Sequence, residues 1–338
     1  MGDPAGVGPE IIALAFRDAP DARRGAFVAG DVAALRRAAR IVQGASGVPL
    51  PVAEIEQPAD ALDAPPCCVP VLQAVAPPSG QAALPPFGQV SAQAGRMAGE
   101  AVFWAARSAL RGAVAAIVTA PLNKAALAAA GAPYDRFPGH TELLQEQAAA
   151  HLGVPVAQMP VRMMLANDEL RTVLVSIHVS LRKAIARVTR ENVLQTLRIA
   201  HAALVRALGH APRLAVAGLN PHAGEGGLFG REEIQHIAPA IEQARGEGID
   251  ARGPFAPDTV FMRARRQEFD AVIAMYHDQG LIPVKYLGVE RGVNVTLGLP
   301  FVRTSPDHGT AFDLAGTGRA DPASLLAALG MARRLAAR

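Results

Sequence analysis

The sequence predicts an α/β protein built from two lobes with a largely parallel β-sheet. Short runs rich in β-branched residues alternate along the chain with stretches long enough for amphipathic helices, which is typical of βαβ units. The 338 residues exceed one ordinary domain and allow two lobes with cores of their own. Hydrophobic residues make up 50% and charged residues 19% of the chain, as in folded rather than disordered proteins.

The expected strands are short apolar runs bounded by polar or turn-forming residues. They are Ala26–Ala29, Ala115–Thr119, Val161–Ala166, Arg171–Ile177, Leu214–Ala217 and Val272–Met275. The expected helices carry apolar residues at helical spacing. They are Pro9–Phe16, Val32–Val42, Ser91–Leu110, Thr141–Leu152, Glu191–Leu208, Glu232–Arg245 and Pro322–Ala337.

The lobes are expected to divide the chain unevenly. Gln43–Val90 is rich in Pro, Ala and Gly, so it predicts an irregular excursion with a short strand or two. We place residues 1–136 and 301–338 in the first lobe and residues 137–300 in the second, which also carries the dimer interface. The chain leaves the first lobe near Pro133–Gly139 and returns near Leu299–Thr304.

The first residues form a glycine-rich loop that feeds a helix. Gly2 to Glu10 either bring the backbone close to an anion at the helix N-terminus or form an ordinary tight turn. The segment lacks the G-x-G-x-x-G pattern of dinucleotide-binding folds, and so does the rest of the chain. Such a loop normally follows a strand. We therefore expect an upstream extension to add a strand and raise thermal stability.

Composition argues against several classes of protein. The formal net charge is only +3, and no dense Lys/Arg run with interleaved aromatic residues occurs, which argues against nucleic-acid binding. No run of about 18 apolar residues predicts a membrane span, and the start does not resemble a secretory leader. Cys67 and Cys68 are neighbours, so they cannot join distant segments. These features favour a cytoplasmic protein.

Three histidines follow three of the expected strands. His178 comes after Leu174–Ile177, His222 lies in the segment Asn220–Gly227, and His277 follows Val272–Met275. Three imidazoles with open positions suit a catalytic divalent cation. Spacings of 222 − 178 = 44 and 277 − 222 = 55 residues are too long for a local metal motif. The residue pattern alone therefore leaves separate, structural histidines as the other interpretation.

Two further groups of residues are suited to binding an anion. His140 and Thr141 follow the segment Thr119–Lys124, although Thr141 is also suited to a plain helix N-cap. Lys285, Asn294 and Arg303 lie further along the chain. Lys and Arg together hold phosphate or carboxylate, and Arg binds two oxygens at once. Lys285 could also act as an acid or base if it is buried beside another cation, while an exposed, solvated lysine is the alternative.

Taken together, these segments resemble the 4-hydroxythreonine-4-phosphate dehydrogenase family, including D-threonate/D-erythronate 4-phosphate dehydrogenase-like members. The matching stretches occur in order from residue 1 to about residue 316. They are MGDPAGVGPEI, TAPLNKAAL, PGHTELL, NPHAGEGG, PDTVF, MYHDQG and GVNVTLGLPFVRTSPDHGTAFDLAG. The resemblance implies a fold like the isocitrate and isopropylmalate dehydrogenases, with two lobes and a central cleft. It also implies a homodimer whose subunits share each active site.

The resemblance also implies a role for each candidate residue. His178, His222 and the partner subunit's His277 take the places of metal ligands. The substrate-binding positions are His140, Thr141, Lys285, Asn294 and Arg303. Lys285 and Asp258 are the catalytic candidates. The implied cofactors are NAD or NADP and a divalent metal, namely Zn, Mg, Co or Ni.

The implied reaction is oxidation of the hydroxyl of a small phosphorylated hydroxy acid of the 4-phosphooxy-L-threonine type, followed by decarboxylation, as in pyridoxine biosynthesis. Segments around His178, Gly227 and Lys285 look closer to relatives that act on D-threonate or D-erythronate 4-phosphate, or on a cis-dihydrodiol dicarboxylate of terephthalate breakdown. The presence of His140 and Thr141 favours a phosphorylated substrate. A metal-dependent hydrolase and an acyl- or phosphotransferase are the competing classes, and a cofactor assay and metal content distinguish them.

Overall fold

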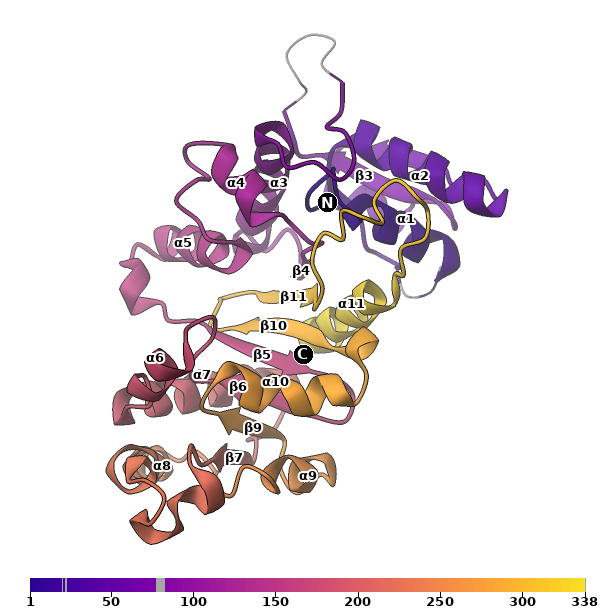
Figure 1. Ribbon diagram of the computed structural model, residues 1–338. Coiled ribbons are helices and arrows are strands. Elements are labelled where there is room, and N and C mark those ends of the chain that lie inside the picture. The colour runs from indigo at the N-terminus through magenta and orange to yellow at the C-terminus, as the bar shows by residue number, and fades with distance from the viewer. Residues whose placement is uncertain (20, 22, 77–82, 338) are drawn as a thin grey trace. The chain divides into compact units, whose positions relative to one another are not determined.

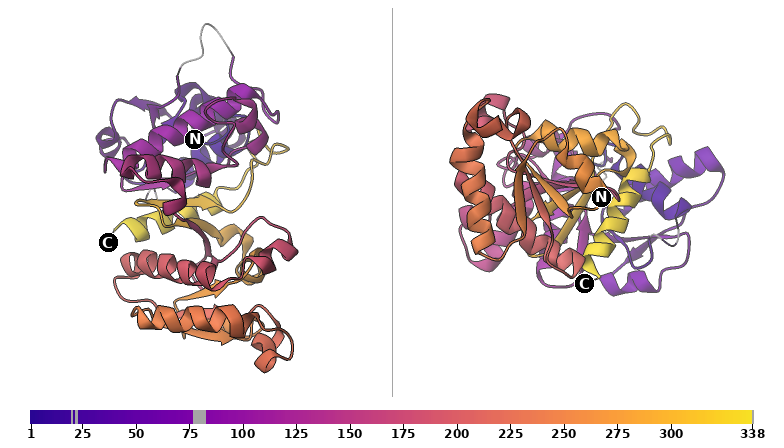
Figure 2. Two further views of the ribbon diagram at one scale, coloured as in Figure 1. Left: turned by 90° about the vertical axis from the view of Figure 1, so that its left-hand side faces the viewer. Right: turned by 90° about the horizontal axis from the view of Figure 1, so that it is seen from below.

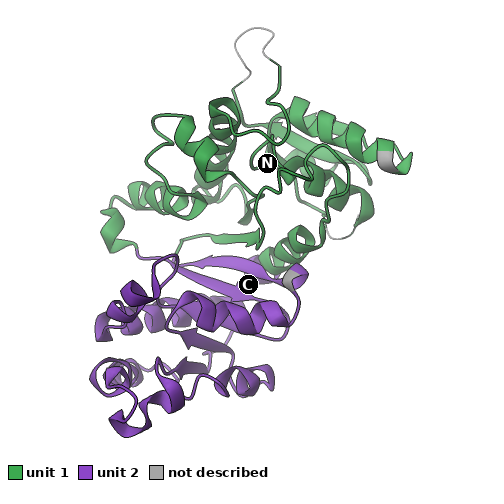
Figure 3. Ribbon diagram, viewed as in Figure 1, with its two compact units in different colours: residues 1–159, 299–333 green, residues 160–298, 334–338 purple. Residues whose placement is uncertain are grey.

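The computed structural model describes residues 1–19, 21, 23–76 and 83–337, and it forms two compact units (Figure 3). Unit 1 comprises Met1–Met159 and Leu299–Arg333, and unit 2 comprises Pro160–Gly298 and Arg334–Arg338. The chain therefore leaves unit 1 about twenty residues later than the sequence analysis placed the change of lobe. In consequence, His140 and Thr141 belong to unit 1, together with Arg303, rather than to the second lobe.

Unit 1 contains helices and strands from both ends of the chain (Figure 1). Its elements are α1 (Gly8–Asp18), β1 (Val28–Gly30), α2 (Val32–Ser46), β2 (Val52–Ile55), η1 (Pro58–Leu62), β3 (Val69–Gln73), α3 (Ala92–Leu110), β4 (Ala116–Val118), α4 (Lys124–Ala129), α5 (His140–Leu152), η2 (Val156–Gln158), β11 (Val302–Pro306) and α11 (Ala323–Ala336).

The strands of unit 1 pair in parallel. A three-stranded sheet has the order β1-β3-β2, and β11 pairs with β4 so that Arg303 lies opposite Ile117. The helices α1 and α2 cover a core formed by Ile11, Leu35 and Val71. Close packing accounts for the Gly2 loop, because a Cβ on Gly2 would lie 2.5 Å from the Pro121 carbonyl oxygen. The structure therefore explains this glycine as a packing requirement.

Unit 2 is a continuous middle section of the chain except for its last residues. Its elements are β5 (Arg162–Ala166), β6 (Arg171–Leu174), α6 (Leu181–Ala186), α7 (Arg190–Leu208), β7 (Leu214–Ala217), η3 (Pro221–Gly227), η4 (Glu233–Ile237), α8 (Ala238–Gly246), β8 (Ala251–Phe255), α9 (Val260–Arg265), β9 (Ala271–Ala274), α10 (His277–Tyr286), η5 (Val289–Arg291) and β10 (Val293–Leu297).

The strands of unit 2 lie in the order β10-β5-β6-β9-β7-β8, with helices on both faces (Figure 2). The pairs β6/β9, β7/β9 and β7/β8 are parallel, whereas β5 runs antiparallel to β6 and β10. Helices α7 and α8 pack together, while α9 and α10 pack on β9. The predicted α/β class with a mostly parallel sheet is confirmed. No helix within the described ranges has both the length and the apolar character of a membrane span.

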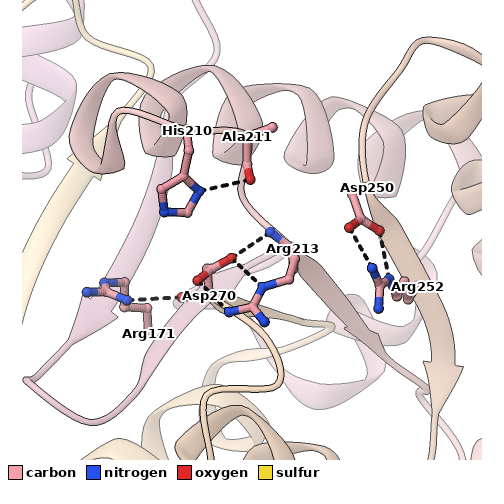
Figure 4. A network of polar contacts seen from close by, with 7 residues as sticks. All are labelled: Arg171, His210, Ala211, Arg213, Asp250, Arg252 and Asp270. Carbon is pink, nitrogen blue, oxygen red and sulfur yellow. Dashed lines mark hydrogen bonds and ion pairs between the residues drawn. The ribbon is translucent and has the colours of Figure 1, made fainter.

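Ionic contacts tie the amino ends of the central strands of unit 2 (Figure 4). The guanidinium of Arg213, just before β7, donates to both carboxylate oxygens of Asp270, just before β9, at 3.1 Å each. Arg171 donates to the Asp270 carbonyl oxygen at 3.2 Å. These contacts join the strands at their amino ends. The segments that carry the histidines follow the opposite, carboxyl ends.

Several elements differ from the prediction. The strand β6 ends at Leu174 rather than at Ile177, so His178 lies four residues beyond it. The helix expected over Glu232–Arg245 begins instead with the π-helical turn η4. The expected excursion Gln43–Val90 contains the strands β2 and β3. The helices α4, α6, α9 and α10 and the strands β8, β10 and β11 were not predicted.

Candidate active-site residues of each unit

The three histidines lie beyond the carboxyl ends of three adjacent strands in unit 2. His178 follows β6, His222 follows β7 and His277 follows β9, and the sheet order places β9 between β6 and β7. Because these strands are parallel, their carboxyl ends share one edge of the sheet, where α/β proteins bind ligands. The structure therefore places each histidine beyond the strand after which the sequence analysis expected it, at the carboxyl ends of neighbouring strands.

Two of the three rings lie next to each other within one chain. The ring centroids of His178 and His277 are 5.5 Å apart. Metal–nitrogen bonds of about 2 Å place the rings of two ligating imidazoles at roughly this separation, so the pair fits a shared divalent cation. Among the described residues, however, no group of three or more His, Cys, Asp or Glu side chains is placed to hold a metal ion. A third ligand is therefore needed to complete such a site.

The backbone around His222 is strained. Residues 222–226 all have left-handed φ angles, between 42° and 81°. His222, Ala223 and Glu225 are not glycines, and each such residue costs about 1–2 kcal/mol in this conformation. His178 also has a positive φ, of 39°. Backbone strain of this kind concentrates at functional sites, where the surrounding structure enforces it.

A cavity of about 680 Å³ opens beside His222 in unit 2. Its walls come from the segments before α9 and at the start of α10, and they include Asp258, Tyr276 and Gln279. Asp258 is exposed on this wall. The structure thus brings the acidic candidate to the same cavity as one of the histidines.

Lys285 and Asn294 lie at other places in unit 2. His277 is the first residue of α10 and Lys285 is near its end, so about 12 Å of helix axis separates them. Asn294 is in β10, opposite Leu165 of β5. These two residues share unit 2 with the histidines, but neither lines the cavity.

A buried cation dominates the candidate anion site of unit 1. Arg303 in β11 is only 4% exposed, and its Nη2 and Nε donate to the Thr119 hydroxyl at 2.7 and 3.2 Å. Burial lowers the pKa of Arg303 to about 10, while the charge of Glu142 acts in the opposite direction. The guanidinium stays charged at neutral pH. A buried positive charge of this kind is suited to an anionic ligand.

His140 and Thr141 begin the helix α5 in the same unit. The preceding Gly139 has an extended backbone and makes no side-chain cap, so the amide groups of the first turn are not capped by that residue. The Nε2 atom of His140 is inaccessible to solvent and has no hydrogen-bond partner among the described residues. A buried ring nitrogen, a helix N-terminus and the Arg303 guanidinium are together suited to binding phosphate or carboxylate.

The lowered pKa of His140 should make the stability of the folded protein depend on pH. Burial, followed by the positive charges of Arg303 and the chain's amino terminus, lowers this pKa well below 6.5. Below about pH 6.5 the unfolded chain binds a proton at His140 that the folded protein does not, so stability should fall as the pH falls. In His140→Asn, the melting temperature should depend less steeply on pH between 7.5 and 5. Parallel curves for variant and wild type would contradict this assignment.

Two residues that contact these groups, or the loop that carries one of them, were not identified as site residues from the sequence. Thr119 was noted only as part of a strand-end segment, although it contacts the Arg303 guanidinium. Glu233 was seen as an ordinary helix residue, although it is buried and accepts hydrogen bonds from the loop before His222. Its position 11 residues after His222 carries no local signal. Only the fold shows the contact.

The fold and these two groups define an α/β protein with a buried arginine and the start of the helix α5 in one unit, and histidines beyond the carboxyl ends of parallel strands in the other. The model of the family described as pyridoxal phosphate biosynthetic protein PdxA matches residues 22–332. The chain belongs to this family.

The proteins similar to this chain include 4-hydroxythreonine-4-phosphate dehydrogenases and D-threonate 4-phosphate dehydrogenases. A 4-hydroxythreonine-4-phosphate dehydrogenase of Beijerinckia indica is 53% identical over 336 residues, covering 99% of this chain and 93% of that protein. A D-threonate 4-phosphate dehydrogenase of Pectobacterium atrosepticum is 44% identical, covering 99% and 98%. The crystal structure of a Klebsiella pneumoniae 4-hydroxythreonine-4-phosphate dehydrogenase is 41% identical, covers 100% and 97%, and superposes with a TM-score of 0.87.

Proposed function

We propose that this protein is a nicotinamide-dependent dehydrogenase that oxidises the hydroxyl group of a small phosphorylated hydroxy acid. The observation that carries the proposal is membership of the PdxA family over residues 22–332, with a 53% identical relative of that activity. The preferred substrate is of the 4-phosphooxy-L-threonine type. D-threonate 4-phosphate is the second candidate, because relatives of that name are 44–45% identical. We propose that decarboxylation follows the oxidation and that NAD or NADP accepts the hydride.

The residues of unit 1 are proposed to hold an anionic end of the substrate. The Arg303 guanidinium supplies a buried positive charge, and Thr119 orients it through two hydrogen bonds. His140 and Thr141 add donors at the start of α5, where the amide groups also favour an anion. Because His140 is neutral at pH 7, it can donate one N–H group without adding a second buried charge.

The residues of unit 2 are proposed to hold a divalent cation and to move a proton. His178, His222 and His277 would supply nitrogen ligands, and such an ion makes a bound hydroxyl easier to deprotonate. Oxidation removes a hydride and a proton from the alcohol. Lys285 and Asp258 are the proposed groups for that proton, and Asn294 is proposed to contact the substrate. Both charged groups lie in the same unit as the histidines, and Asp258 lines the cavity beside His222.

A homodimer is proposed to complete the histidine site. In unit 2, exposed apolar side chains gather on the two segments that carry His222 and His277. They are Leu228, Phe229, Ile234, Ile282 and Tyr286, the last 91% exposed. Large exposed apolar groups are typical of surfaces that meet a partner. A second copy covering them would bring another set of histidines to the same region. The cytoplasmic location remains a prediction from the sequence.

The experiment that tests the function is a substrate panel followed by reduction of the nicotinamide. The purified protein is incubated with 4-phosphooxy-L-threonine, D-threonate 4-phosphate, D-erythronate 4-phosphate and a cis-dihydrodiol dicarboxylate, each with NAD or NADP. We expect reduction with a phosphorylated substrate and none with its dephosphorylated form. Release of phosphate without reduction of either nicotinamide would instead identify a hydrolase and overturn the proposal.

A further inference from the structure

Glu233 is a buried carboxylate that accepts hydrogen bonds from the loop that leads into His222. It is 3% exposed and begins the π-helical turn η4. One carboxylate oxygen accepts the backbone N–H groups of Leu219 and Asn220 at 2.7 and 2.8 Å. The other accepts the side-chain amide of Asn220 at 3.0 Å. All three bonds therefore act on the two residues directly before Pro221 and His222.

Glycines in this loop let the backbone approach the carboxylate. A Cβ on Gly224 would lie 2.7 Å from one Glu233 oxygen, and a Cβ on Gly218 would lie 3.1 Å from the other. Gly224 also has a φ of +81°, a conformation that side-chain-bearing residues rarely adopt. The loop thus wraps around the Glu233 carboxylate before and after His222. Contact with Glu233 therefore accounts for glycine at position 224, whereas a Cβ on Gly218 would meet the Ala223 Cα at 2.8 Å before it reached Glu233.

The π-helical turn η4 and a hydrogen bond from α10 stabilise the segments on either side of the loop that carries His222. The backbone N–H of Ala238 donates to the Glu233 carbonyl oxygen, five residues back, and such turns often occur at functional sites. Gln279, two residues after His277, donates to the Gly218 carbonyl oxygen at 2.8 Å. The His222 loop is therefore held by Glu233 on one side and by the helix that begins at His277 on the other.

We propose that Glu233 is a positioning residue that keeps the loop 218–227 in its left-handed conformation and so sets the place of His222. A carboxylate suits this role because it accepts on both oxygens and has no proton to donate. Glutamine would turn one of its ends into a donor facing the Asn220 amide, which is also a donor. The consequence for metal binding rests on the proposed function, whereas the consequence for loop order does not.

The test compares Glu233→Gln and Glu233→Ala with Glu242→Gln, a matched control at an exposed glutamate of α8. Affinity for Zn²⁺ is measured by competition with a chromogenic chelator, and amide hydrogen exchange is measured in residues 218–227. We expect Glu233→Gln to bind Zn²⁺ about 10- to 100-fold more weakly, as for groups that orient metal ligands. Exchange in the loop should accelerate, while the control and the KM for the nicotinamide should stay at wild-type values.

The two measurements separate the possible failures. If both Glu233 variants keep wild-type Zn²⁺ affinity and wild-type exchange in the loop, the positioning role is wrong. If the wild type binds no Zn²⁺, the proposed metal site is wrong, and exchange alone decides the role of Glu233. A general loss of folding in Glu233→Ala would accelerate exchange throughout unit 2. The milder glutamine variant then gives the decisive comparison, because it keeps two of the three acceptor contacts.

Discussion

Replacing His222 with alanine is expected to abolish turnover and weaken metal binding while the fold stays intact. His222 is exposed at a sheet edge and contributes no core packing, so its removal should leave the melting temperature within a few degrees of wild type. Removing a group that merely orients a metal ligand typically lowers metal affinity or activity about 10- to 100-fold. We therefore expect loss of the ligand itself to lower both activity and metal affinity by more than about 100-fold.

A histidine in the same unit provides the matched control. His210 is exposed, and its ring contacts the neighbouring Ala211 carbonyl oxygen near the amino end of β7 (Figure 4). His210→Ala makes the same chemical change at the opposite end of the strand that leads to His222. It should leave activity, metal content and melting temperature unchanged. A His222→Ala protein that is fully active without metal would remove the basis for a metal-dependent mechanism.

Mixtures of two inactive variants test whether subunits share the site. If the partner subunit's His277 completes a site that also contains His222, a hybrid of His222→Ala and His277→Ala chains retains one intact site of two. Random mixing makes about half of the dimers hybrids, so about a quarter of wild-type activity should return. If all three histidines act within one chain, every site in the hybrid lacks one ligand. Mixing would then restore nothing.

The sequence predicted that His178, His222 and His277 follow neighbouring strands, because each of these strands has a pattern that can be recognised locally. The strands β6, β7 and β9 are short apolar runs, and such runs are recognised without knowledge of the fold. The rule that ligands bind beyond the carboxyl ends of parallel strands then placed His178, His222 and His277 together. The ring separation of His178 and His277 within one chain depends on sheet order, which the sequence does not reveal.

Elements that were missed carry local signals against their observed structure. The helix α10 contains Gly280 and Pro283, both poor helix formers. The helix forms nevertheless because it packs on β6, where a Cβ on Gly280 would lie 2.4 Å from the Leu174 side chain. Its glycine permits that approach. Tertiary packing therefore decides the conformation against the local propensity.

The strands β10 and β11 were missed for a different reason. Their residues were interpreted as ligand contacts and as the return between the lobes, although Val293–Leu297 alternates apolar and polar side chains as a half-buried strand does. The place of Arg303 in β11 matters for its role, because strand pairing with β4 sets Arg303 next to the end of that strand and Thr119. The change of lobe after residue 136 was also misplaced, since α5 packs on α3 within unit 1.

Replacing Arg303 with methionine is expected to weaken binding of the phosphorylated substrate more than any other change in unit 1. Methionine fills a similar volume without charge, so the buried site remains filled and the folded protein loses a buried cation. Truncating one partner of a buried charge pair costs about 2–5 kcal/mol. The value of kcat/KM for the phosphorylated substrate should therefore fall at least about 30-fold, mostly through KM.

Two comparisons separate the contribution of the planar pair of N–H donors of Arg303 to substrate binding from the contribution of its charge. Arg303→Lys keeps a positive charge but loses the planar pair of donors, so its kcat/KM should lie between those of wild type and the methionine variant. Arg319→Met removes an exposed arginine of the same unit and should behave as wild type. If Arg303→Met raised the KM of the nicotinamide and left that of the substrate unchanged, Arg303 would bind the cofactor instead. Because both ligands are anionic, only these separate KM values distinguish the two assignments.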